Sequence, residues 1–202
     1  MSAIRLIVGL GNPGTQYEGT RHNAGAFFVR RLATKYGLTW SADRNAFGDV
    51  VRGSVAGHDL RLLVPHTFMN ESGRSVAAMA NYYRIDAGEI LIAHDELDIP
   101  PGESRIKHDG GHGGHNGLRD VIPALGGRKD FWRLRIGIGH PGSAKQVSAW
   151  VLSKAASADQ TAIECSIDAA MAALPLLLDG EPVKAMTALH SEHHQPPLNK
   201  KD

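Results

Sequence analysis

The chain has 202 residues, 42% of them hydrophobic, and is predicted to bury a full core as one domain. This composition excludes a chain that is disordered throughout, and no apolar run of about 18 residues predicts a membrane span. The formal net charge of +1 indicates no particular partner, but residues 103–154 hold nine Lys or Arg against four Asp or Glu, so that region suits an anionic ligand.

The first residues lead directly into a strand-like run, without the apolar segment and cleavage site of a signal peptide. The single cysteine, Cys165, excludes a disulfide within the chain. We therefore expect a cytoplasmic protein that does not associate with a membrane.

A β-branched apolar run over residues 4–10 predicts a first, central strand. Residues 9–14, GLGNPG, then fit the dinucleotide-binding pattern G-x-G-x-x-G. That pattern requires a helix to begin at once, whereas Pro13 removes a backbone amide and the next amphipathic run covers residues 24–36. A dinucleotide-binding fold is therefore disfavoured.

The late helix leaves a long loop beside the end of the first strand. The side chains of this loop that could bind a ligand or take part in a reaction are those of Asn12, Tyr17, Arg21 and His22. Asn23 is a candidate N-cap for the helix that follows. A histidine before a helix is usually ordinary. Within reach of a carboxylate it would be an oriented general base.

Residues 49–55 and 59–64 predict two strands joined as a hairpin. A loop over residues 65–70 follows, and a helix is predicted to begin at Glu71 or Ser72 and to run through Tyr83. The loop holds three residues of interest: Asn70 as a candidate cap, and Phe68 and Met69 as core residues or as an apolar wall for a ligand.

Residues 90–93, ILIA, predict a buried strand that delivers His94, Asp95, Glu96 and Asp98 at its carboxyl end. Ligands bind at that end of the strands in open α/β sheets. A glycine-rich loop over residues 110–117 then leaves the backbone open to a ligand. We place the active site here.

More ordinary roles compete for these residues. Asp95 could bind backbone amides at the strand end, and Asn116 could be the N-cap of the next helix. The loop histidines His108, His112 and His115 could be solvated or could bind a metal. Metal spacing is a weak signal here, because no cysteine accompanies them and no H-E-x-x-H pattern is present.

The remaining pattern predicts a helix over residues 117–125 and a strand over 131–139 in which arginines alternate with apolar residues, giving one basic face. Further helices are predicted over residues 145–152, 157–178 (kinked or shortened by Pro175) and 182–190, before a disordered tail over 191–202. The fold class is α/β: a three-layer α/β/α domain around a twisted sheet that is mostly parallel but mixed because of the hairpin.

Four segments together resemble the bacterial peptidyl-tRNA hydrolase family: VGLGNPGTQYEGTRHNAG, FMNESG, HDELDIPPG and GGHGGHNGLRD. The resemblance spans residues 8–140 in order and spacing, and the later helices are compatible with it to about residue 190. It implies a monomeric catalytic domain over residues 1–190. Its reaction would be hydrolysis of the ester between a peptide and the 3′-terminal ribose of tRNA, which recycles tRNA from aborted translation.

The resemblance also implies roles for individual residues. His22 would be the general base that activates water, and Asp95 would orient it. Substrate would be held by Asn12, Tyr17, Met69, Asn70, His115 and Asn116. A tRNA phosphate would be bound by Lys107 and Arg135. The resemblance implies an enzyme that uses no metal and no cofactor.

The sequence departs from the family pattern at two positions. Asp109 stands directly before the glycine run and brings a negative charge near the implied phosphate site, and Val64 stands where a lysine is common. Two other classes stay open on the residues alone: a metal-dependent hydrolase built on His94, Asp95, His112 and His115, and a non-catalytic nucleotide- or RNA-binding module. A serine nucleophile is disfavoured because no G-x-S-x-G motif is present.

Overall fold

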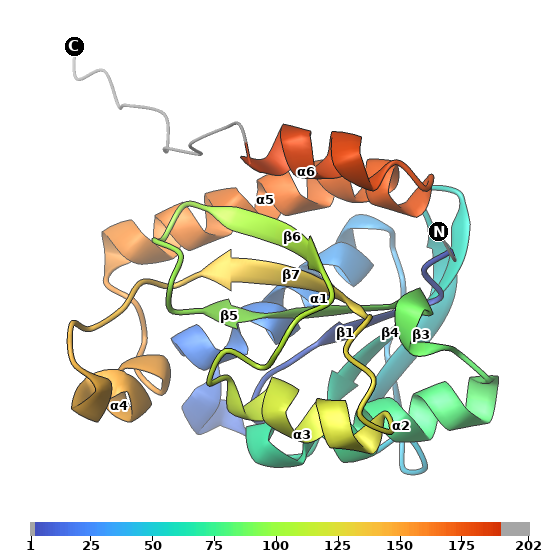
Figure 1. The fold of residues 1–202 in the computed structure, drawn as a ribbon, viewed down its shortest axis with the longest axis horizontal. Helices are drawn as coiled ribbons and strands as arrows, with labels where there is room; N and C mark the ends of the chain where they lie inside the picture. Colours follow the sequence, from blue (N-terminus) through green and yellow to red (C-terminus); the bar gives the residue numbers. More distant parts are fainter. Residues whose placement is uncertain (1–2, 191–202) are drawn as a thin grey trace.

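The computed structural model describes residues 3–190 and shows a seven-stranded sheet between two layers of helices (Figure 1). The strands are β1 (Leu6–Gly9), β2 (Ser41–Asp43), β3 (Gly48–Val55), β4 (His58–Pro65), β5 (Ile90–Glu96), β6 (Ser104–His108) and β7 (Trp132–Gly137). The α-helices are α1 (Ala24–Lys35), α2 (Ser72–Tyr83), α3 (Asn116–Ala124), α4 (Val147–Val151), α5 (Ser157–Leu178) and α6 (Pro182–His190). Short 3-10 helices are η1 (Thr15–Tyr17), η2 (Arg21–Asn23), η3 (Met69–Glu71), η4 (Ala87–Glu89) and η5 (Ala144–Gln146).

The strand order is β2-β3-β4-β1-β5-β7-β6. The four central strands β4, β1, β5 and β7 are parallel, whereas the pairs β2–β3, β3–β4 and β6–β7 are antiparallel. The prediction of a mixed sheet in a three-layer α/β domain is confirmed: the sheet is parallel at its centre and antiparallel toward both edges.

Two hydrophobic cores lie on opposite faces of the sheet, because alternate side chains of a strand point to opposite faces. On β1, Ile7 packs with residues of α1, α5 and α6, whereas Leu6 and Val8 pack with residues of α2 and α3. Figure 1 shows α5 and α6 on one face of the sheet and α2 and α3 on the other.

The predicted hairpin, the helices over residues 72–83, 157–178 and 182–190 and the central strands are all present. Two strands were not predicted: β2, which has three residues, and the edge strand β6. Pro175 does not shorten α5, which runs on to Leu178. The predicted disordered tail lies outside the described residues, and the domain bounds of 1–190 stay a prediction.

Helix α5 is long and apolar enough to cross a membrane by length and composition alone. Half of its most apolar window is buried inside the protein. Its buried residues, among them Ile163, Ile167 and Leu174, belong to the core that also holds residues of α1 and α6. This packing is that of a core helix in a globular domain.

The start of α1 is pressed against the ends of β1 and β5. A Cβ atom at Gly25 would lie 2.1 Å from the carbonyl oxygen of Ala93, and one at Gly9 would lie 2.4 Å from the carbonyl oxygen of Gly25. Only glycine allows an approach this close. The first glycine of the GLGNPG segment therefore serves the packing of α1 on the sheet, and the residues just before α1 are held against the end of β5.

Candidate active site

A cleft of about 730 Å³ lies at the carboxyl ends of β1, β4 and β5. These strands are parallel, so the segments that follow them meet at one edge of the sheet. All eight residues predicted to be catalytic or substrate-binding line this cleft: Asn12, Tyr17, His22, Met69, Asn70, Asp95, His115 and Asn116.

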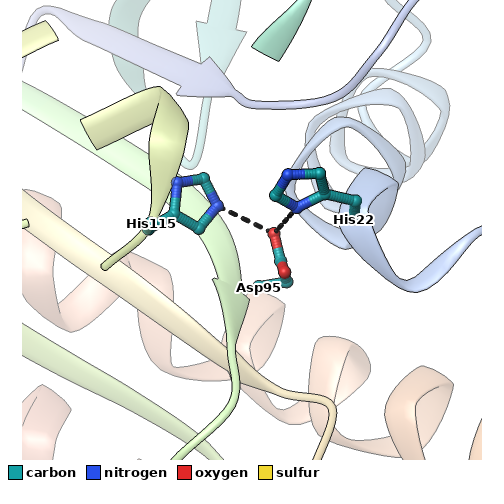
Figure 2. A group of neighbouring side chains, drawn as sticks. All are labelled: His22, Asp95 and His115. Atoms are coloured by element: carbon teal, nitrogen blue, oxygen red, sulfur yellow. Dashed lines mark hydrogen bonds and ion pairs between the residues drawn. The ribbon is translucent and has the colours of Figure 1, made fainter. Parts of the chain in front are cut away.

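The centre of the cleft is a buried carboxylate between two imidazoles (Figure 2). His22 Nδ1 lies 2.9 Å from Asp95 Oδ1, and His115 Nε2 lies 2.8 Å from the same oxygen. Asp95 lies on β5, His22 on η2 and His115 directly before α3. The predicted proximity of His22 and Asp95 is thus present in the fold, and among residues 3–190 the Asp95 carboxylate accepts from these two imidazoles rather than from backbone amides.

Asp95 is 3% exposed and stays ionised. Burial alone would raise the pKa of its carboxyl group. The two imidazoles that face it more than offset that effect and hold the pKa of Asp95 well below its usual range, with His115 contributing before His22. Since a carboxylate accepts hydrogen bonds, both facing nitrogens carry hydrogens, and His22 is left with Nε2 as a proton acceptor.

His115 is fixed as a donor to Asp95 by its other nitrogen. Its Nδ1 accepts hydrogen bonds from the backbone N–H groups of Gly117 at 3.1 Å and Leu118 at 3.3 Å, so the ring hydrogen is on Nε2. His115 is therefore the N-cap of α3. The alternative that gave this role to Asn116 is wrong: Asn116 is the first residue of the helix, and its Oδ1 accepts from Arg119.

His94 lies beneath this group and is 2% exposed. Burial, followed by the proximity of His115, lowers its pKa to about 3, so the ring is neutral at physiological pH. Its Nδ1 donates to the backbone carbonyl oxygen of Asp95 at 2.7 Å, and its ring contacts that of His115 edge-on with centroids 4.9 Å apart. These contacts hold the end of β5 and the ring of His115 in place.

Asn12 is held by two neighbours. The side chain of Asn23 accepts from the backbone N–H of Asn12 at 2.8 Å and donates to its carbonyl oxygen at 2.9 Å. The Oδ1 of Asn12 accepts from the backbone N–H of Met69 at 2.8 Å. Asn23 is the residue at the N-cap position of α1, as predicted, but its side chain makes no capping hydrogen bond because it binds the loop after β1. The Nδ2 of Asn12 has no partner among residues 3–190 and remains a free donor.

The rim of the cleft is partly aromatic and partly polar. Asn70 and Asn116 are exposed, and Phe68 is 52% exposed with Tyr17 packed edge-on against it. Met69 is buried, and a Cβ atom at Gly117 would lie 2.6 Å from its sulfur. Phe68 thus belongs to the wall of the cleft and Met69 to its floor.

The segment around α4 is joined to η2, which holds His22, by Arg21, whose role had not been predicted. Its guanidinium lies 3.6 Å over the ring of Trp150 and donates to Ser153 Oγ at 2.7 Å. Burial lowers the pKa of Arg21. This arginine joins η2, and with it the neighbouring His22, to the segment around α4.

Known proteins of similar sequence and structure share one description. A family model described as peptidyl-tRNA hydrolase matches residues 6–197. A peptidyl-tRNA hydrolase of Pseudomonas putida is 57% identical over 192 residues, covering 95% of this chain and 99% of that protein. The crystal structure of peptidyl-tRNA hydrolase from Acinetobacter baumannii has a TM-score of 0.90 and 53% identity, covering 94% of this chain and 95% of that one.

The chain belongs to the peptidyl-tRNA hydrolase family. A second relative, from Azotobacter vinelandii, is 56% identical over 191 residues. A crystal structure of peptidyl-tRNA hydrolase with N-propanol has a TM-score of 0.91 and covers 96% of both chains. The resemblance inferred from the sequence is confirmed, and with it the identification as a hydrolase.

A second, smaller pocket of about 310 Å³ adjoins the cleft. Its walls include Lys107 and Arg135, the two residues predicted to bind phosphate, and also Arg133. Arg135 donates through Nε to the carboxylate of Glu96 at 2.9 Å. The terminal nitrogens of Arg135 have no partner among the residues that the structure describes.

Arg133 and Arg135 share one face of β7, but Arg133 is 2% exposed. It donates to the carbonyl oxygens of Phe131 and Gly110. Burial lowers the pKa of Arg133 to about 10, and nearby Asp109 acts in the opposite direction. Arg133 therefore supports the glycine loop, and the charge of Asp109 acts on it.

A metal-binding arrangement on His94, Asp95, His112 and His115 is not formed: His112 is exposed, and its Nδ1 accepts from the backbone N–H of Gly114. The described residues bring together His22, Asp95 and His115, whose potential ligand atoms all lie within 4.8 Å of one another. A neutral imidazole bound to a metal through Nε2 carries its hydrogen on Nδ1. At His115 that hydrogen would face two backbone N–H donors, so the hydrogen-bonding pattern disfavours a metal here.

Proposed function

We propose that the chain hydrolyses the ester between the peptide and the 3′-terminal ribose of peptidyl-tRNA, with His22 as the general base. The observation that carries this proposal is the hydrogen bond from His22 Nδ1 to the buried Asp95 in a cleft at the carboxyl ends of parallel strands. It leaves Nε2 of His22 to take a proton, as a general base requires.

The reaction proceeds through a tetrahedral intermediate. A water molecule gives one proton to His22 Nε2 while its oxygen attacks the ester carbonyl carbon. The intermediate then collapses, the bond to the ribose oxygen breaks, and that oxygen takes the proton back from His22. Asp95 stabilises the imidazolium that forms between these steps. The products are a peptide carboxylic acid and a tRNA with a free 3′-hydroxyl.

The developing negative charge on the carbonyl oxygen requires a donor. Asn12 suits this role because its Oδ1 is bound to Met69 and its Nδ2 is free among the described residues. One well-placed donor of this kind stabilises a transition state by about 3 kcal/mol. Asn70 and Asn116 are exposed at the rim and suit the ribose or the peptide main chain, since a carboxamide both donates and accepts. Tyr17, Met69 and His115 complete the substrate-binding surface.

The finer features of the prediction belong to this proposal as well. The acceptor end of tRNA is its macromolecular ligand, and the enzyme acts as a cytoplasmic monomer that recycles tRNA from aborted translation. No cofactor takes part. The direct test is cleavage of a labelled peptidyl-tRNA by the purified protein, and absence of cleavage would overturn the proposal.

We expect the activity to survive prolonged treatment with EDTA. The general-base scheme needs no metal, and the hydrogen bonds at Nδ1 of His115 oppose metal binding at its Nε2. Initial rates are compared before and after chelation and after addition of zinc. Loss of activity on chelation with recovery on adding zinc would favour a metal-dependent hydrolase instead.

We expect Lys107→Ala and Arg135→Ala to raise KM for peptidyl-tRNA with little change in kcat. Both residues line the smaller pocket, and both offer cationic groups that could bind one phosphate. Each lost contact should reduce the slope of log K against log salt by about 0.7 to 0.9. Cleavage of a minimal substrate that carries only the terminal nucleotide should be unchanged.

Lys35→Ala serves as the matched control for these two variants. Lys35 is the last residue of α1, the helix that begins directly after η2, so this change removes the same charge from the end of that helix far from His22. For Lys35→Ala, the slope of log K against log salt should equal that of the unmodified protein. Equal losses on the full and the minimal substrate in the two pocket variants would show that Lys107 and Arg135 support the fold or the catalytic centre.

A further inference from the structure

One oxygen of Asp95 serves two imidazoles, and the proposed mechanism uses only one of them. His22 and His115 lie at 2.9 and 2.8 Å from Asp95 Oδ1, so neither contact is the weaker by distance. The two rings are also close to each other, with centroids 5.1 Å apart (Figure 2). The charge that would stabilise a protonated His22 is therefore partly engaged by His115.

His115 cannot easily give up its position. Its Nδ1 accepts from the backbone N–H groups of Gly117 and Leu118, which fixes the ring hydrogen on Nε2 and turns that hydrogen toward Asp95. On its other side the ring packs edge-on against the buried His94. The helix start and the sheet thus together hold the N–H group at Nε2 of His115 against the carboxylate.

We propose that His115 is a positioning residue that divides the charge of Asp95, reduces the stabilisation that Asp95 gives to protonated His22, and so keeps His22 in its basic form to lower pH. This inference rests on the proposed function, in which His22 is the general base. A carboxylate shared between two donors is polarised by both and interacts less strongly with each.

The other ionisable groups around His22 and Asp95 do not donate to the Asp95 carboxylate in place of His115. On β5, His94 is neutral and bound to the backbone of Asp95, and Glu96 is paired with Arg135 of β7. From η2, Arg21 points to Trp150 and Ser153 beside α4. Tyr17 lines the cleft from η1.

The electrostatics of Asp95 agree with this division. Burial would raise the pKa of Asp95, and the two imidazoles that face it lower that pKa. Removing the donor of His115 should therefore leave more of the negative charge to His22.

The test compares the pH–rate profiles of His115→Asn and His112→Asn, with peptidyl-tRNA as substrate. Asparagine is a favoured N-cap and offers an acceptor near the level of Nδ1, but its side chain ends short of Nε2 and cannot reach Asp95. His112→Asn makes the same substitution three residues earlier, at an exposed side chain whose Nδ1 accepts from Gly114.

We expect the acidic limb of kcat/KM to move up by about 0.5 to 1 pH unit in His115→Asn, a fraction of the shift that a neighbouring carboxylate can cause. The limb should stay in place in His112→Asn. An unmoved limb in His115→Asn, with only kcat or KM changed, would overturn the inference and leave His115 as a cap or a substrate contact. An equal shift in both variants would also overturn it.

Failure of the inference is distinguishable from failure of the proposed function. If His22→Ala retains activity, the general-base mechanism itself is wrong and the inference falls with it. If His22→Ala is inactive while the limb of His115→Asn does not move, only the division of charge is wrong.

Discussion

Replacing His22 with alanine should reduce kcat/KM for peptidyl-tRNA by more than about 100-fold, because a positioned general base contributes about 10²- to 10⁴-fold to the rate. No other nitrogen in the described cleft is as well placed. His115 presents its hydrogen-bearing Nε2 to Asp95 and its Nδ1 to the backbone, and the ring nitrogens of His94 are buried beneath it. The measurement is the initial rate of peptidyl-tRNA cleavage near neutral pH.

The variant His22→Asn provides a folding control for this result. A carboxamide has a donor that can still bond to Asp95 but has no basic nitrogen, so it should be as inactive as His22→Ala while the circular dichroism spectrum of both matches that of the unmodified protein. Activity above about one hundredth in a folded His22→Ala would mean that His22 is not the base.

The central sheet could be predicted because it depends on local pattern, whereas the pairing of His22 with Asp95 was implied by the resemblance to the family. Apolar β-branched runs mark buried strands, and a residue that follows such a strand lies at the edge where ligands bind. The late start of α1 was readable from the sequence as well, since Pro13 and a polar loop delay it. The adjacency of β1 and β5 in the structure brings this loop and the carboxylate of Asp95 to the same edge of the sheet.

The edge strand β6 escaped prediction because its partners are distant in the sequence. It pairs with β7, and the backbone N–H of Ile106 donates to the side chain of His190 at the end of α6. A short segment of mixed polarity carries little signal of its own. Here tertiary contacts decide the conformation, which single-residue preferences cannot convey.

The same limit explains the errors in helix capping. Asparagine ranks high as an N-cap, which favoured Asn116 and Asn23. In the structure, His115 binds Asp95 through Nε2 and caps α3 through Nδ1. The side chain of Asn23 instead hydrogen-bonds the backbone of Asn12. On β7, alternation predicted a basic face without distinguishing Arg133, buried under the glycine loop, from Arg135.

The structure sharpens what Asp95→Asn should do. Because Nδ1 of His115 accepts from two backbone N–H groups, Nε2 of that ring must donate, so the new carboxamide has to present its oxygen rather than its NH₂ group to both imidazoles. The hydrogen on His22 therefore stays on Nδ1 and Nε2 remains the base. What the substitution removes is the negative charge alone.

We therefore expect Asp95→Asn to reduce kcat by about 10-fold to 100-fold, less than the loss of His22. A hydrogen bond to a charged group contributes about 1.5 to 3 kcal/mol, and each 1.36 kcal/mol changes a rate tenfold. The acidic limb of the pH–rate profile should move to lower pH, since a neutral amide does not favour the imidazolium. The measurement is that profile for the variant beside the unmodified protein. If the limb stays where it is while the rate falls, Asp95 holds the two rings in place without stabilising their charge, and the electrostatic part of the mechanism is wrong.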